Sequence, residues 1–159
     1  MRLETNLGNI DLELYPERAP ETVANFLARV DEGFYDGLIF HRVVAGFVIQ
    51  AGGYDHKLTY RPPPATVANE SVGGLRNEKY TVAMARLADP DSADTQFFIN
   101  VKHNPHLDAT GDKPGYTVFA RVIDGDYVVT TIELVDTGIE AGMAGVPEED
   151  VIIKQAVRL

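Results

Sequence analysis

The segment from Tyr35 to Ala51 carries an arginine, an aromatic ring and an amide at a spacing that suits one binding groove. Arg42, Phe47 and Gln50 lie in the run L-I-F-H-R-V-V-A-G-F-V-I-Q, which is interrupted only by Ala45-Gly46. Its β-branched and aromatic residues predict two strands joined by a kink, which would turn the three side chains toward one groove. A guanidinium stays charged and presents several donors in a rigid plane, so the set favours hydrogen-bond donation to a bound ligand.

Taken singly, these residue types carry little weight. A phenylalanine or valine in a strand is usually core, and an isolated arginine is usually a surface charge. The joint spacing of Arg42, Phe47 and Gln50 is what favours a functional site. His41 is interpreted as a structural histidine beside that site and not as a proton shuttle.

Several other chemistries lack the residues they need. The motifs G-x-S-x-G, G-x-x-x-x-G-K-[ST], H-E-x-x-H and G-x-G-x-x-G are absent, and there is no cysteine for a disulfide, a thiolate ligand or a nucleophile. His103 and His106 flank Asn104-Pro105, and the proline prevents a regular helix that would aim both imidazoles at one metal. No metal and no cofactor is expected. Asn69-Glu70-Ser71 matches a glycosylation sequon, which has meaning only after secretion.

Length and charge set the broad class. The chain has 159 residues, of which 45% are hydrophobic, enough for one core, so we expect a single domain over residues 1–159. A formal net charge of -10 opposes binding to nucleic acid or an anionic membrane. No signal-peptide pattern and no membrane-spanning run is present, so we expect a cytoplasmic protein, or a periplasmic or secreted one if a signal peptide was removed. A monomer is expected because no long exposed apolar stretch is evident.

The elements that would position the site are mostly strands. Asn9 to Leu14 alternates polar and apolar residues and predicts a strand, while Pro20 to Gly33 has the period and end signals of a helix. Gly52 to Gly74 has no sustained period and contains Arg61-Pro62-Pro63-Pro64; it is interpreted as an ordered loop, with a proline-rich docking motif as the alternative. Asp126 to Val135 fits either a strand or a helix.

Further strand-length apolar stretches complete the pattern. Many short strands with one clear helix predict a closed barrel. These stretches are Tyr80 to Ala85, Gln96 to Val101, Tyr116 to Val122 and Val151 to Val157.

The sequence resembles the cyclophilin family. The segment around the expected groove matches the family signature at Tyr35, Leu38, Phe40-His41-Arg42-Val43-Val44, Phe47-Val48 and Gln50-Ala51. The resemblance continues at Val82 to Arg86, Asp94 to Ile99, His106-Leu107-Asp108 and Tyr116 to Val122. It implies a mainly β fold, a closed antiparallel eight-stranded cyclophilin-like β-barrel capped by two α-helices. The implied activity is peptidyl-prolyl cis/trans isomerisation, which assists protein folding.

The resemblance also implies a set of site residues. Arg42, Phe47 and Gln50 take the catalytic positions, and proline-containing peptides and unfolded or partly folded proteins are the implied partners. The implied substrate-binding residues are Val48, Ala85, Arg86, Leu87, Gln96, Phe98, His106, Leu107 and Tyr116. A non-catalytic proline-peptide-binding or chaperone module is the main alternative, and an unrelated small barrel for a hydrophobic ligand is a second.

Three positions depart from the family pattern. His106 stands where many cyclophilins carry a tryptophan associated with tight cyclosporin binding, so weak cyclosporin binding is expected. Tyr116 replaces a histidine at the pocket rim, and Arg86 replaces an asparagine of the groove strand. The segment Asp108 to Gly115 is also longer than the common linker.

Overall fold

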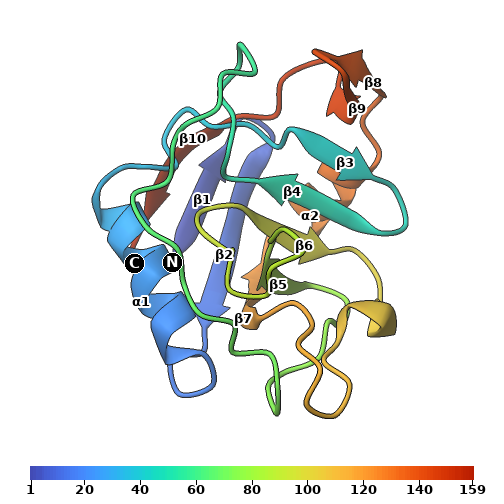
Figure 1. Cartoon of the computed structure of the whole chain (residues 1–159). Helices are drawn as coiled ribbons and strands as arrows, with labels where there is room; N and C mark the ends of the chain where they lie inside the picture. Colours follow the sequence, from blue (N-terminus) through green and yellow to red (C-terminus); the bar gives the residue numbers. More distant parts are fainter.

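Eight antiparallel strands form one sheet that curls around a buried core in the computed structural model, which describes all 159 residues (Figure 1). The spatial order is β10-β1-β2-β7-β5-β6-β4-β3. The strands are β1 (Arg2–Thr5), β2 (Gly8–Leu14), β3 (Arg42–Val44), β4 (Val48–Ala51), β5 (Thr81–Met84), β6 (Phe97–Asn100), β7 (Val118–Asp124) and β10 (Ile153–Val157).

The two ends of this order meet just outside the named strands. Ile39 and Ile152 form an isolated antiparallel bridge. The Phe40 N–H donates to the Val151 carbonyl at 2.9 Å, and the Ile153 N–H donates to the Leu38 carbonyl at 2.8 Å. The predicted eight-stranded antiparallel barrel is confirmed, and this short bridge, instead of a full ladder between β3 and β10, joins its edges.

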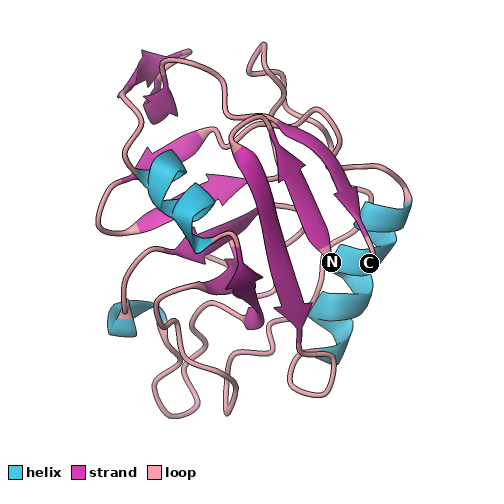
Figure 2. Cartoon of the chain, turned by 180° about the vertical axis from the view of Figure 1, so that it is seen from behind, coloured by secondary structure: helices cyan, strands magenta, loops and turns pink.

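Two helices cover opposite ends of the curled sheet (Figure 2). The helix α1 (Pro20–Asp31) begins at a proline, as predicted, and buries one apolar face. Its first turn is held by Glu70, whose carboxylate accepts from the Thr22 N–H and hydroxyl, both at 2.7 Å. A single-turn 3-10 helix, η1 (Pro105–Leu107), follows β6. Neither α-helix is long and apolar enough to span a membrane.

The ambiguous segment after β7 forms the second helix, α2 (Asp126–Glu133). Its sequence is rich in β-branched residues, which favour strands. The helix forms because Val128, Val129 and Ile132 then lie on one face and become buried against the sheet. Gly125 precedes α2 with a φ of 88°, and a side chain there would collide with the Asn9 carbonyl oxygen.

The sheet is covered by apolar side chains on both faces where the site lies. Phe97 belongs to the interior cluster of 29 buried residues, in which it packs with Phe26 at a centroid separation of 5.6 Å. Its neighbour Phe98 points to the opposite face, because successive strand side chains alternate. There it joins a second cluster with Val48, Ala83 and Val118. The second cluster is the base on which the candidate site is built.

The sequence predicted the long loop before β5 but not the small hairpin after α2. The segment from 52 to 74 contains only isolated bridges, so the predicted ordered loop is confirmed. The small hairpin of β8 (Thr137–Glu140) and β9 (Met143–Pro147) was not predicted. It forms a separate two-stranded sheet beside β3 (Figure 1).

Candidate active site

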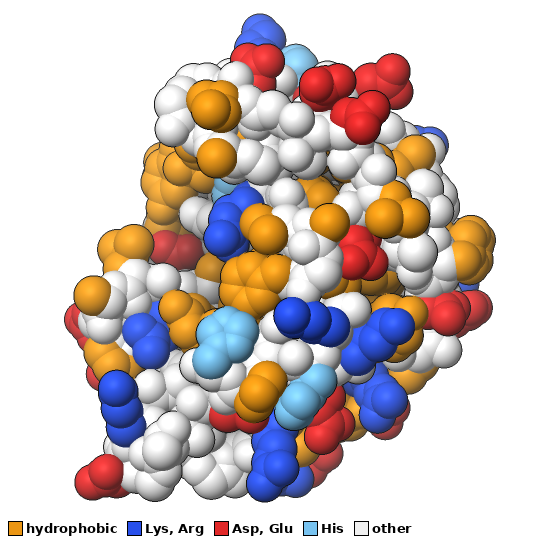
Figure 3. Space-filling model, turned by 90° about the vertical axis from the view of Figure 1, so that its right-hand side faces the viewer, with side chains coloured by type: hydrophobic (Ala, Val, Ile, Leu, Met, Phe, Trp, Pro, Cys, Tyr) orange, Lys and Arg blue, Asp and Glu red, His pale blue; other side chains and the backbone are white.

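A cavity of about 370 Å³ lies on the outer face of the sheet, over β3, β4 and β6. Figure 3 views the molecule from its right-hand side in Figure 1 and shows basic and histidine side chains beside apolar ones in the middle of that face. All the lining residues are among those that the sequence analysis singled out: Arg42, Phe47, Val48, Gln50, Ala85, Arg86, Phe98, His106, Leu107 and Tyr116.

The orientation of Arg42 is set by two glutamines. Arg42 and Gln50 are direct partners across the β3–β4 pair, and the Arg42 Nη1 donates to Gln50 Oε1 at 3.4 Å. The Gln50 Nε2 in turn donates to Gln96 Oε1 at 2.9 Å. Gln50 is the only hydrogen-bond acceptor of the Arg42 side chain, so most of its donors remain free at the cavity.

The turn between β3 and β4 places Phe47 next to this guanidinium. Gly46 adopts a φ of 72°, which favours glycine, and its N–H donates to the Glu133 carboxylate of α2 at 2.8 Å. The Phe47 carbonyl accepts from the Asn104 side chain at 3.0 Å and from the Val101 N–H at 3.1 Å. The Arg42 Cζ consequently lies 5.9 Å from the centre of the Phe47 ring.

The cavity floor is apolar and nearly free of solvent contact. Val48 and Phe98 are buried on the outer face of β4 and β6, and Leu107 packs against them from η1. His106 stacks on the Phe47 ring, with 5.5 Å between ring centres and 24° between the planes. The floor therefore suits a small apolar ring, with a cation and an amide at its edge.

Arg86 closes the opposite rim. Its Nε donates to the Gly115 carbonyl at 3.0 Å, and its Nη1 donates to the Leu87 carbonyl at 2.9 Å. Its Cζ lies 4.6 Å from the centre of the Tyr116 ring, which itself packs edge-on against Phe98 at 5.7 Å. Arg86 thus connects the chain after β5 to the long segment before β7 and holds Tyr116 at the rim.

A second cavity of about 260 Å³ adjoins the first and shares Gln50, Ala85 and Arg86 with it. Leu87 and Gln96, the two remaining residues singled out from the sequence, line this second cavity. Sequence reasoning missed its other lining residues, because they lie in irregular segments that give no periodic signal. These are Tyr54, Tyr60, Ser92 and Asp94.

His41 is buried behind the cavity and lines neither space. Its ring packs against Tyr54 with 4.7 Å between centres, and its Nδ1 has no hydrogen-bond partner. Burial, with a smaller contribution from the Arg42 charge, lowers the pKa of His41 to about 4. The imidazole is therefore neutral near pH 7, which leaves Arg42 as the cation at this end of the site.

Comparison with known proteins assigns the chain to a family. The model for cyclophilin type peptidyl-prolyl cis-trans isomerases matches residues 1–158. The peptidyl-prolyl cis-trans isomerase cyp18 of Streptomyces antibioticus is 49% identical, over 98% of this chain and 96% of that protein. The peptidyl-prolyl cis-trans isomerase B of Escherichia coli is 46% identical, over 94% of this chain and 93% of its own length.

Structural comparison agrees with the sequence matches. A cyclophilin type peptidyl-prolyl cis-trans isomerase of Cryptosporidium parvum, crystallised in the presence of the dipeptide Ala-Pro, aligns with a TM-score of 0.78 and 27% identity. The alignment covers 97% of this chain and 94% of that one. The chain belongs to the cyclophilin-type peptidyl-prolyl cis-trans isomerase family. Its activity is the interconversion of cis and trans Xaa-Pro peptide bonds, as the resemblance implied.

Proposed function

We propose that Arg42 accelerates this rotation by donating a hydrogen bond to the proline nitrogen of the twisted peptide bond. Rotation destroys amide resonance, and the barrier is about 18–20 kcal/mol. In the twisted state the nitrogen becomes pyramidal and regains a lone pair that a planar amide does not offer. A donor fixed at that point binds the transition state more tightly than either ground state, and no covalent bond needs to form or break.

The geometry around Arg42 supports this role. Its guanidinium is held by Gln50, which is itself held by Gln96, so its direction is set before substrate binds. The remaining donors can reach the proline nitrogen and the prolyl carbonyl together. This preorganised cation beside an apolar floor is the observation that carries the proposal, because fixed donors need no reorientation during the reaction.

The apolar floor supports placement of the proline ring over Phe47, Val48, Phe98 and Leu107. A pyrrolidine seated there would displace water from the cavity, and a hydrogen bond from Arg42 would be strengthened by the lower local polarity. His106 and Tyr116 stand at the rim, where they would contact the flanking parts of the substrate.

We propose that proline-containing peptides and unfolded segments lie along the chain after β5. The Ala85 carbonyl and the Arg86 N–H have no hydrogen-bond partner within the protein, so both are available to an extended peptide. The residues before proline would then approach the second cavity, which Leu87 and Gln96 line. The Cryptosporidium parvum relative was crystallised in the presence of Ala-Pro, which supports recognition of Xaa-Pro segments.

The test is an isomerase assay on a short Xaa-Pro peptide with Arg42→Ala. We expect kcat/KM to fall by about two to three orders of magnitude with the fold retained, as when one preorganised donor is lost. Arg158→Ala removes an exposed arginine far from the cavity and should keep full activity. Near-normal kcat/KM in folded Arg42→Ala protein would refute the assignment.

A further inference from the structure

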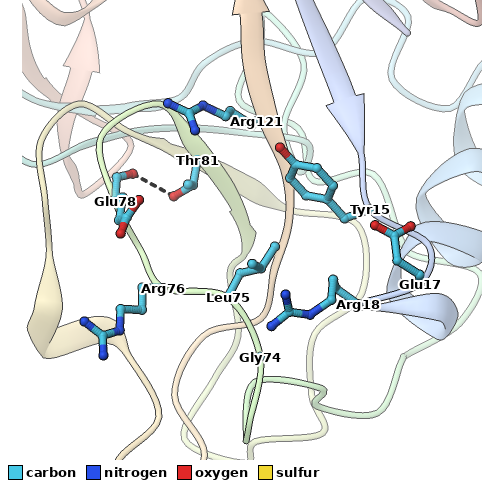
Figure 4. A pocket seen from close by; sticks show the side chains of 9 residues that line it. All are labelled: Tyr15, Glu17, Arg18, Gly74, Leu75, Arg76, Glu78, Thr81 and Arg121. Atoms are coloured by element: carbon cyan, nitrogen blue, oxygen red, sulfur yellow. Dashed lines mark hydrogen bonds between the residues drawn. The ribbon is translucent and has the colours of Figure 1, made fainter.

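Another pocket, of about 620 Å³, lies apart from both of these cavities, on the outer face of β5 and β7. Figure 4 shows its walls: Thr81 and Arg121 lie on the two strands, Tyr15 and Arg18 lie on the chain that leads into α1, and the loop from Gly74 to Glu78 forms the other side. It shares no lining residue with the proline cavity or with the cavity next to it.

The arginines of this pocket are exceptional within the chain. Six of the nine arginines donate a side-chain hydrogen bond to a carboxylate, an amide or a backbone carbonyl: Arg2, Arg29, Arg42, Arg61, Arg86 and Arg158. The other three, Arg18, Arg76 and Arg121, have no acceptor, and all three line this one pocket. A protein with a formal net charge of -10 therefore gathers its unpaired guanidiniums in one place.

A further polar donor and an apolar surface complete the pocket. The half-buried Tyr15 hydroxyl has no hydrogen-bond partner, and burial together with the Glu13 and Glu17 charges raises its pKa, so it remains protonated and able to donate. Its ring and the Leu75 side chain provide the apolar contact (Figure 4).

Acidic side chains surround the pocket as well, and Glu13 is the cross-strand partner of Arg121, but it forms no ion pair with it. Glu17 and Glu78 line the pocket with the three arginines, and neither carboxylate is within ion-pair distance of a guanidinium. In Figure 4 Arg18 extends toward Leu75, whereas Arg76 points outward at the rim. The Arg18 and Arg121 guanidiniums lie on opposite sides of the pocket in Figure 4, so one anion would be bound by rotation of these two exposed side chains toward it.

We propose that this pocket binds an oxyanion, a carboxylate or phosphate, that is carried on a small apolar group. The guanidiniums of Arg18 and Arg121 and the Tyr15 hydroxyl bind the anion, and Leu75 and the Tyr15 ring contact the apolar group. Arginine suits such a ligand because its planar donors match two oxygens of a carboxylate or phosphate.

The position of Leu75 places the pocket next to the catalytic face. Leu75 also packs against the cluster of Val48, Ala83, Phe98 and Val118 that supports the proline cavity. Leu75 therefore connects the anion site to the base of the isomerase site, although the two cavities share no lining residue. A free small anion and an acidic side chain of a bound polypeptide carry the same chemistry, so the test uses one probe of each kind.

The experiment is an amide NMR titration of the whole protein with phenyl phosphate and, separately, with the proline-free peptide acetyl-Phe-Glu-Glu-amide. We expect concentration-dependent shifts at the amides of Tyr15, Glu17, Arg18, residues 74–78 and Arg121 that weaken as salt is added. Benzyl alcohol, which keeps the ring and lacks the anion, should not cause them. Shifts with phenyl phosphate alone identify a small-molecule site, and shifts with the peptide as well identify acidic side chains as ligands.

The matched variants are Arg18→Gln/Arg121→Gln and, as control, Lys57→Gln/Lys154→Gln, which removes the same charge from exposed sites elsewhere. The first should weaken phenyl phosphate binding by about tenfold, the combined effect of two exposed charge contacts, and the second by less than about twofold. Unchanged isomerase activity in both shows that the fold is intact. The proposal is overturned if neither probe shifts these amides at about 10 mM, or if both variants bind alike.

Discussion

At the scale of single residues, His106 is where the cavity departs most from the family pattern. Its imidazole stacks on Phe47 at the rim, but it is smaller and less apolar than the indole found there in many cyclophilins. We predict weak cyclosporin inhibition of the protein and an affinity about tenfold or more higher for His106→Trp, which adds apolar area and an N–H donor. Inhibition of the isomerase assay measures both values, and nanomolar inhibition of the unaltered protein would contradict the prediction.

At the scale of elements, Arg86 joins two segments that have no ladder between them. Its bonds to Gly115 and Leu87 and its contact with Tyr116 hold the long segment before β7 against the groove. We predict that Arg86→Ala lowers kcat/KM by about tenfold and speeds hydrogen exchange at Tyr116, because one cation makes several charge-assisted bonds there. Arg86→Lys should recover little, since lysine lacks the planar donors.

Arg61→Ala is the matched control for this element. Arg61 also donates to two backbone carbonyls, those of Phe34 and Asp36, and also lies over an aromatic ring, but it lines neither the proline cavity nor the cavity next to it. The Arg61→Ala protein should therefore be less stable than the wild type but keep its kcat/KM. Equal loss of kcat/KM in the Arg61 and Arg86 variants would mean that Arg86 acts only through general stability.

The elements that carry the site are also those that the sequence predicted best. The run from Leu38 to Gln50 has dense β-branched and aromatic residues and one glycine that requires a positive φ, so strand, turn and strand follow locally. The helix α2 stayed ambiguous because its β-branched residues contradict the helix that burial selects. The hairpin β8–β9 was missed because Gly138, Gly142 and Gly145 interrupt its apolar pattern.

At the scale of the whole molecule, a site assembled from distant segments is predictable from the sequence only where a family signature marks its residues. The proline cavity was anticipated because the family resemblance marks its residues in five segments. The arginine pocket was not, since Arg18, Arg76 and Arg121 come from three separate segments and only the curl of the sheet brings them together. Each arginine, read alone, is an ordinary surface charge.

Global stability should depend on pH through His41, which is buried with an unpartnered Nδ1. Burial and then Arg42 lower its folded pKa from 6.5 to about 4, so between these values the unfolded chain binds a proton that the folded protein does not. The free energy of unfolding is therefore highest above about pH 6.5. It falls as the pH decreases toward 4, by up to about 3 kcal/mol. Urea unfolding across this window measures the slope.

The comparison with His41→Gln isolates this histidine. Asp11 and Asp31, whose pKa values are lowered by hydrogen bonds from Arg2 and Arg158, also lose stabilisation as pH falls, but equally in both proteins. The difference in unfolding free energy between the wild type and His41→Gln should shrink toward low pH, because glutamine does not titrate. His103→Gln removes an exposed histidine and should leave the wild-type slope. A difference that stays constant across the window would show that His41 does not resist protonation in the fold.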